Sequence, residues 1–322
     1  MITETLTSPV ILFFILGFLA AMVRSDLAIP EAFAKAMSIY LMAAIGLKGG
    51  VEVASTGFTA DLGWAAFAGI TLGFLLPIPA FYLLRHFGKL GSLDSGAVAA
   101  HYGSVSVVTF VTATEIFAAR NIAPEGYMVG VMALMETPAI ITGLLLARAG
   151  MKQSTPATAP SSTSNLLHEV FTNGSVVLLL GAFAIGMVAG ADGFQPIKPL
   201  FEVGFRGVLC LFLLDMGLIA ARRLLQSRQL TVRLVVLAVL MPVMNGFVGV
   251  ALGTLIGLDP GSAATLGILA ASASYIAVPA AMRMALPEAD PSIYLTMSLG
   301  ITFPFNILIG IPLFGNVAQM IG

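Results

Sequence analysis

The sequence predicts an all-α polytopic membrane protein, with ten transmembrane helices arranged as two inverted five-helix repeats that each contain a discontinuous helix. Three observations lead to this fold class. Hydrophobic residues make up 58% of the chain and charged residues only 10%, against roughly 25% charged residues in an ordinary soluble domain. Apolar runs recur along the chain, and a helix of about 20 such residues crosses roughly 30 Å of hydrocarbon. A short polar pattern in the first half returns 168 residues later.

The apolar runs define ten predicted spans. They cover approximately residues 8–23, 33–49, 62–84, 93–117, 124–147, 168–190, 199–220, 231–257, 261–283 and 291–315. The first twenty residues contain no Lys or Arg, so they lack the basic region of a cleaved signal peptide, and we assign them to the first span. Alternation with a period of two is weak, which disfavours a transmembrane β-barrel.

A stretch rich in Ser, Thr, Pro and Ala separates the fifth span from the sixth, and this composition is typical of a flexible linker. We therefore expect a first five-helix repeat over residues 1–150, a cytoplasmic linker over 151–166 and a second repeat over 167–322. Eleven of the 15 Lys and Arg residues fall on one side when the N-terminus is placed outside. The positive-inside rule then places both termini on the outer side of a cell (inner) membrane.

The two halves align residue by residue, with little drift in the offset. Ser104 and Ser106 match Ser272 and Ser274, and Gly46 matches Gly217 at an offset of 171 residues. Each half contains an odd number of predicted spans. The second half must therefore enter the membrane from the opposite side, which makes the repeat inverted.

The fourth and ninth spans carry the matching polar stretches, 104–114 and 272–281. β-Branched residues weaken a helix in the first stretch, and Pro279 signals a break in the second because proline removes a helical hydrogen bond. Irregular backbone at membrane depth is tolerated only where it is buried in protein or lines a cavity. We therefore expect both breaks to meet in the interior, where hydroxyls and helix N-termini bind a small oxyanion. The candidate substrate-binding residues are Gly103, Ser104, Ser106, Thr109, Ser272, Ser274 and Tyr275. The alternative for each hydroxyl is a bond to a carbonyl of its own helix.

No Lys or Arg lies in either break to neutralise a bound anion, so we expect a co-bound cation. A carboxylate at mid-membrane costs at least ~2.5 kcal/mol on insertion scales, which draws attention to Glu115, Glu136 and Asp215. For each acid the alternative is an ion pair or a contact at a helix end. The candidate sodium-binding residues are Thr112, Glu136, Asp215 and Ser274. Asn245 and Asn306 are predicted to form interhelical hydrogen bonds.

Several function classes are disfavoured. The near-zero net charge gives no indication of a nucleic-acid partner, and the single cysteine, Cys210, excludes an intramolecular disulfide and a cysteine-based metal cluster. No zinc-protease motif, nucleophile elbow or P-loop is present. We expect no enzyme, no organic cofactor and no metal other than sodium.

The full chain resembles the sodium-dependent bicarbonate transporter family, whose best-known member is the cyanobacterial bicarbonate permease. The resemblance rests on IPEAFAKAMSIYLMAAIGLKGG, HYGSVSVVTFVTATE and METPAI in the first half, and on FRGVLCLFLLDMGL and ASASYIAVPAAMRMALPEADPSIYL in the second. Polar and turn residues match as well as apolar ones.

This resemblance implies that the discontinuous helices cross in a core domain, and that Na⁺-coupled uptake of bicarbonate occurs by alternating access between this core domain and a gate domain. It also implies a homotrimer assembled through the gate domain and regulation by a PII-like cytoplasmic protein. The chain departs from the cyanobacterial pattern at Tyr275, where those members have an acidic residue, and its linker is shorter. The alternatives are a carrier of another small organic or inorganic monoanion, with altered or no sodium coupling, and a passive anion channel.

Overall fold

The computed structural model describes residues 7–57, 59–151, 174–226 and 230–322, and within these ranges it contains helices and no strand. The first half contains α2 (Pro9–Met22), α3 (Glu31–Thr56), α4 (Ala60–Leu75), α5 (Pro77–His86), α6 (Ser92–Gly103), α7 (Val107–Ala119) and α8 (Met128–Met151). The second half begins with α10 (Gly174–Phe194), η1 (Gln195–Ile197), η2 (Pro199–Val203), α11 (Phe205–Gln226), α12 (Val232–Leu255), α13 (Pro260–Ala271) and α14 (Ala277–Ala285). It ends with α15 (Pro291–Leu295), η3 (Thr296–Thr302), α16 (Phe303–Phe305), η4 (Asn306–Gly310) and α17 (Ile311–Ile321). The all-α class is confirmed, whereas the linker 151–166, apart from Met151 in α8, lies outside the described residues.

Helix is present at every predicted span. Within the described ranges, eight helices are long and apolar enough to cross a membrane, and two shorter apolar helices, Pro9–Met22 and Pro260–Ala271, lie at the predicted first and ninth spans. The predicted fourth span is divided into α6 and α7, and the ninth into α13 and α14. The two expected interruptions are thus present in the structure.

Prolines shape several of the long helices. α4 gives way to α5 at Pro77, and the last long segment passes through π-helical turns around Pro304 before α17 begins. Proline lacks a backbone donor and crowds the preceding turn, which accounts for these local changes. α8 and α12 each accommodate one internal proline, Pro138 and Pro242.

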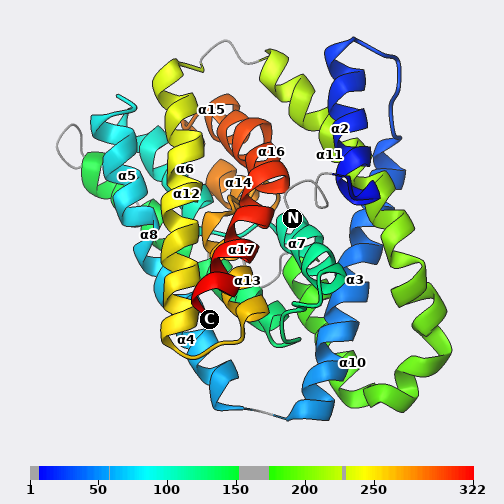
Figure 1. Cartoon of the computed structure of the whole chain (residues 1–322). Coiled ribbons are helices and arrows are strands. Elements are labelled where there is room, and N and C mark those ends of the chain that lie inside the picture. The colour runs from blue at the N-terminus through cyan, green and yellow to red at the C-terminus, as the bar shows by residue number, and fades with distance from the viewer. Residues whose placement is uncertain (1–6, 58, 152–173, 227–229) are drawn as a thin grey trace.

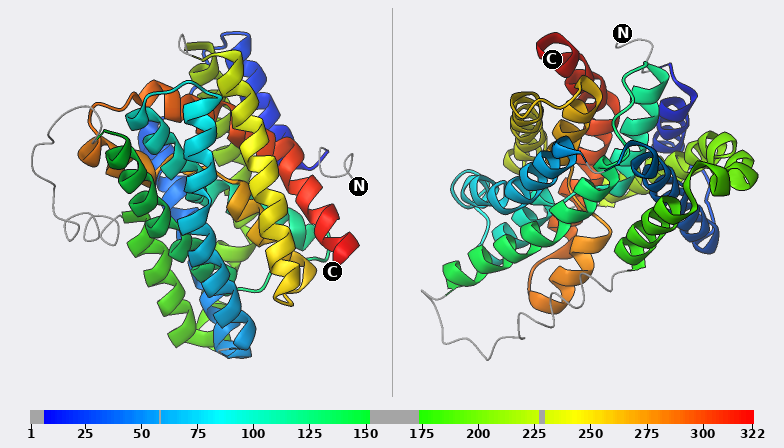
Figure 2. Two further views of the ribbon diagram at one scale, coloured as in Figure 1. Left: turned by 90° about the vertical axis from the view of Figure 1, so that its left-hand side faces the viewer. Right: turned by 90° about the horizontal axis from the view of Figure 1, so that it is seen from below.

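The helices form two groups (Figure 1). α2 packs along α11, and α3 packs along α10, at one side of the molecule. α4, α5, α6, α8 and α12 occupy the opposite side, while α7, α13, α14 and α17 lie between the groups (Figure 1). The long helices run roughly along a common direction, as the side view in Figure 2 shows.

Glycine allows close approach within the first group. A Cβ atom added to Gly50 of α3 would lie 2.0 Å from the carbonyl oxygen of Phe183 in α10. A Cβ atom on Gly217 of α11 would lie 2.2 Å from the carbonyl oxygen of Phe14 in α2. Small residues at such contacts bring two backbones together, which is the usual basis of helix association in membranes.

Candidate functional site

The first interruption lies between α6 and α7. α6 ends at Gly103, and Ser104 and Ser106 have extended backbone conformations. Ser106 then caps α7, since its Oγ accepts hydrogen bonds from the Thr109 amide (3.2 Å) and the Thr109 hydroxyl (2.9 Å). Serine suits this position because its side chain satisfies a backbone donor of the first helical turn.

The second interruption lies between α13 and α14. Ser272 is extended, and the Oγ of Ser274 accepts a hydrogen bond from the Val278 amide at 3.4 Å, near the start of α14. The break spans residues 272–276, so Pro279 does not mark it as the sequence suggested. Pro279 lies in the first turn of α14, where the missing donor would have had no helical partner.

The two interruptions are hydrogen-bonded to each other. The Ser106 amide donates to Ser272 Oγ (2.9 Å), and the Ser274 amide donates to the carbonyl oxygen of His101 (3.0 Å). The Ser272 hydroxyl donates in turn to the Leu269 carbonyl oxygen at 2.8 Å. One backbone amide of each break is therefore satisfied by the other interrupted helix, through the Ser272 hydroxyl in one case and the His101 carbonyl of α6 in the other.

Two asparagines cap the helices that lead into the breaks. Asn245 donates to the Tyr102 carbonyl oxygen at 3.3 Å, and Asn306 donates to the Ala271 carbonyl oxygen at 2.8 Å. The carbonyl groups at a helix C-terminus lack helical partners, and these amides satisfy two of them. The prediction of interhelical hydrogen bonds by both asparagines is confirmed.

A pocket with room for about one water-sized group and an open side lies at the crossing. We call it the polar pocket. It is lined by Val105, Ser106, Val107, Glu136, Ser274, Tyr275, Ile276 and Ala277. Four of the predicted site residues therefore meet here, and they come from both halves of the chain.

The hydroxyl groups of the polar pocket are arranged to donate. Ser106 Oγ and Ser274 Oγ each accept a bond from a helix N-terminus, and this leaves the hydroxyl hydrogen of each serine for another acceptor. The Tyr275 hydroxyl is buried close to the Ser106 side chain, without a partner of good geometry among the described residues. The positive ends of α7 and α14 also face this region, and both favour an anion.

Glu136 brings a carboxylate into the same pocket. Its side chain is 5% exposed, and it reaches the pocket from α8. Carboxylate and hydroxyl oxygens are ligands that hard cations prefer. The residues present therefore fit a bound Na⁺ beside an anion.

The other predicted substrate residues lie outside the polar pocket lining. A Cβ atom on Gly103 would lie 2.3 Å from Pro77, so glycine is required there for packing against α5. Thr109 bonds to Ser106, as described above. The Ser104 hydroxyl is buried and has no hydrogen-bond partner within the described ranges.

Three other polar residues have partners or positions apart from the polar pocket. Thr112 donates to the Val108 carbonyl oxygen at 2.8 Å, which is the alternative considered for every hydroxyl. Asp215 is 6% exposed on α11 and is not among the residues lining the polar pocket. Glu115 forms an ion pair with Arg206 of α11. An ion pair was the alternative to sodium binding that we considered for the acidic residues.

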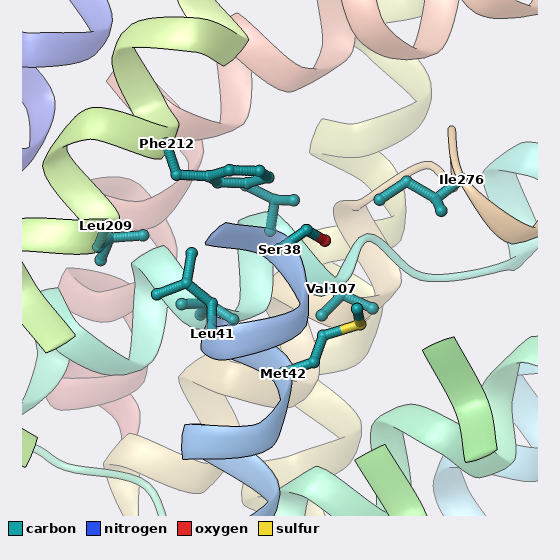
Figure 3. Close-up of a pocket in the computed structure, with 9 residues that line it drawn as sticks. Ser38, Leu41, Met42, Val107, Leu209, Phe212 and Ile276 are labelled. Carbon is teal, nitrogen blue, oxygen red and sulfur yellow. The ribbon is translucent and has the colours of Figure 1, made fainter. Parts of the chain in front are cut away.

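A second pocket adjoins the polar pocket, because Val107 and Ile276 line both. We call it the apolar pocket, and Figure 3 shows it between α3, α7 and α11. Its lining consists of Ser38, Leu41, Met42, Val107, Val108, Val111, Leu209, Phe212 and Ile276. No sequence pattern indicated this pocket, since all of its lining residues except Ser38 are ordinary apolar residues of separate helices.

The helices and their hydropathy define a multi-pass α-helical membrane protein with a polar pocket at the crossing of two interrupted helices. Residues 9–319 match the family model described as the Na⁺-dependent bicarbonate transporter superfamily. The chain belongs to this superfamily, and the predicted resemblance is confirmed. No curated protein matches the chain.

Proposed function

We propose that the protein is a secondary active transporter that takes up bicarbonate together with Na⁺ by alternating access. The observation that carries this proposal is the polar pocket, where both halves of a membrane chain contribute hydroxyl donors beside one buried carboxylate. Membership of the superfamily supplies the substrate and the coupling ion.

The proposal includes ten membrane-crossing segments in two inverted repeats, residues 1–150 and 167–322. Gly46 and Gly217, which align in the two halves, support it. A Cβ atom on Gly46 would lie 2.6 Å from the Leu179 carbonyl oxygen of α10, just as Gly217 approaches Phe14 of α2. The second helix of each half thus packs on the first helix of the other half, as a two-fold repeat requires.

The two helix groups suggest how access would alternate. In our proposal α2, α3, α10 and α11 form the gate domain, and the remaining helices form the core domain that carries the polar pocket. Both pockets include the residues that flank the breaks, and the apolar pocket adds residues of α3 and α11. Movement of the core domain along these two helices would expose the polar pocket to each side in turn.

The bound anion would accept hydrogen bonds from Ser106, Ser274 and Tyr275. An anion next to the Glu136 carboxylate is unfavourable in a water-poor site unless a cation offsets the repulsion. Na⁺ bound by Glu136 and Ser274 would supply that charge, so anion and cation would bind more tightly together than alone. This mutual dependence is the physical basis of symport.

The remaining parts of the proposal concern the cellular setting. We place the protein in the inner membrane with both termini on the outer side, and we propose a homotrimer formed by the gate domain. A PII-like cytoplasmic regulator completes the proposal. These four points rest on charge distribution and on resemblance.

Uptake of radiolabelled bicarbonate into proteoliposomes, with and without an inward Na⁺ gradient, tests the function. We expect uptake above the equilibrium level only with the gradient. Equal uptake with and without Na⁺ would reject coupling and indicate a passive channel. A lack of bicarbonate uptake under both conditions would reject the substrate.

A further inference from the structure

The apolar pocket shares Val107 and Ile276 with the polar pocket, and it offers a bound anion almost no polar partner. Among its nine lining residues, Ser38 alone carries a hydroxyl group. Figure 3 shows that hydroxyl pointing into the space between Phe212, Val107 and Ile276. Val107 and Ile276 stand at the boundary, since they directly follow Ser106 and Tyr275 in the chain.

The shape of a planar anion determines which group faces this boundary. Bicarbonate carries three oxygen atoms on one carbon, and its third oxygen needs hydrogen bonds as much as the other two. When the donors of the polar pocket hold two oxygens, the third would point towards aliphatic side chains and lose its contacts with water, which is unfavourable. A carboxylate has the same two oxygens, with a carbon substituent in the third position.

We propose that the site also binds short-chain monocarboxylates, of which acetate and propionate are the expected ligands. The carboxylate accepts hydrogen bonds from Ser106, Ser274 and Tyr275, and the alkyl group enters the apolar pocket. This inference rests on the anion site of the proposed function, but it does not require bicarbonate to be a substrate. The apolar pocket has room for about one water-sized group and has an open side, which suits a small alkyl substituent.

Thermal unfolding of the purified full-length protein in detergent measures binding, because a ligand that binds the folded state raises the melting temperature. Sodium formate, acetate and propionate are titrated at constant pH, sodium concentration and ionic strength. We measure binding rather than uptake because protonated acetic acid crosses bilayers without a transporter. Formate is the matched control, since it has the carboxylate and lacks the methyl group. Burial of one methyl group corresponds to about 0.8 kcal/mol, so acetate should bind about fourfold more tightly than formate.

Two substitutions change the apolar pocket in opposite directions. Ser38→Leu fills it, so the preference for acetate over formate should disappear. Met42→Ala enlarges it, so propionate should gain affinity relative to acetate. Ile39→Leu is the matched control on α3, because Ile39 is 46% exposed and does not line the pocket, and it should leave the acetate-to-formate ratio at about four.

Each outcome decides the inference. Equal affinity for formate and acetate in the unmodified protein would overturn it, as would a ratio that neither Ser38→Leu nor Met42→Ala alters. If Ser38→Leu fails to fold, the direction of the change in Met42→Ala decides. If bicarbonate is not taken up but acetate binds more tightly than formate as expected, the proposed substrate is rejected and the carboxylate inference is retained. Coupled bicarbonate uptake without carboxylate binding would reject this inference alone.

Discussion

Removal of the Ser274 hydroxyl is the sharpest perturbation of the proposed anion site. Ser274→Ala removes one donor from the polar pocket and a long 3.4 Å contact with the Val278 amide. A hydrogen bond to a charged group contributes about 1.5–3 kcal/mol. The KM for bicarbonate should therefore rise by roughly tenfold to a hundredfold, because 1.4 kcal/mol corresponds to a factor of about ten.

Ser106→Ala should have the same effect on KM with an added loss of stability. Ser106 caps α7 through bonds to the amide and hydroxyl of Thr109, and loss of such a cap costs about 1 kcal/mol. Initial rates of sodium-driven bicarbonate uptake give KM, and thermal unfolding in detergent gives the change in stability. Ser298→Ala is the matched control, since its buried hydroxyl donates to the Tyr294 carbonyl oxygen (2.6 Å) outside the polar pocket. A folded Ser106→Ala/Ser274→Ala double variant with unchanged KM would refute the shared site.

Three further predictions follow from the same contacts. Glu136→Gln keeps the shape of the side chain and removes its charge, so the KM for Na⁺ should rise at least about tenfold, which corresponds to a loss of about 1.4 kcal/mol in binding free energy. An unchanged dependence of uptake on Na⁺ concentration would exclude Glu136 as a ligand. Asn306→Ala removes the amide that caps α13, and thermal unfolding should report a loss of about 1–3 kcal/mol, whereas an unchanged melting temperature would contradict this capping role. Gly50→Leu places a Cβ atom 2.0 Å from the Phe183 carbonyl oxygen and should abolish the yield of folded protein in size-exclusion chromatography. The control variant Gly63→Leu should fold, because a Cβ atom at Gly63 has no neighbour within 4 Å. Equal yields of the two variants would refute the close packing of α3 on α10.

The helical segments and both interruptions were predictable because the membrane imposes a local constraint. Each crossing segment must be apolar and must satisfy its own backbone, so hydropathy located the helices, although α3, α11 and α17 extend further along the chain than their predicted spans. The repeated serine pairs located the breaks for a similar reason, since a helix start needs a side-chain cap. The prediction that Pro279 marks the second break was wrong, because proline also occurs in the first turn of a helix, and Pro279 lies in the first turn of α14.

The roles of individual hydroxyl groups were not predictable from the same pattern. Ser104, Ser106, Ser272 and Ser274 look alike in the sequence, yet only Ser106 and Ser274 line the polar pocket. The difference arises from the crossing, where the Ser272 hydroxyl accepts a hydrogen bond from the Ser106 amide, and where Ser104 is buried outside the pocket lining. Likewise, the partner of Glu115 is Arg206, which lies 91 residues further along the chain.

The sequence by itself determined that this is a helical membrane protein with two matching interruptions, because hydropathy and helix capping depend on neighbouring residues and the repeat is a direct comparison of two stretches of the chain. The tertiary structure alone decided that the interruptions are hydrogen-bonded to each other, that Glu136 rather than Asp215 or Thr112 lies beside the serines, and that an apolar pocket adjoins them. Those outcomes depend on how helices distant in sequence pack against each other, and close contacts such as Gly50 with Phe183 fix that packing.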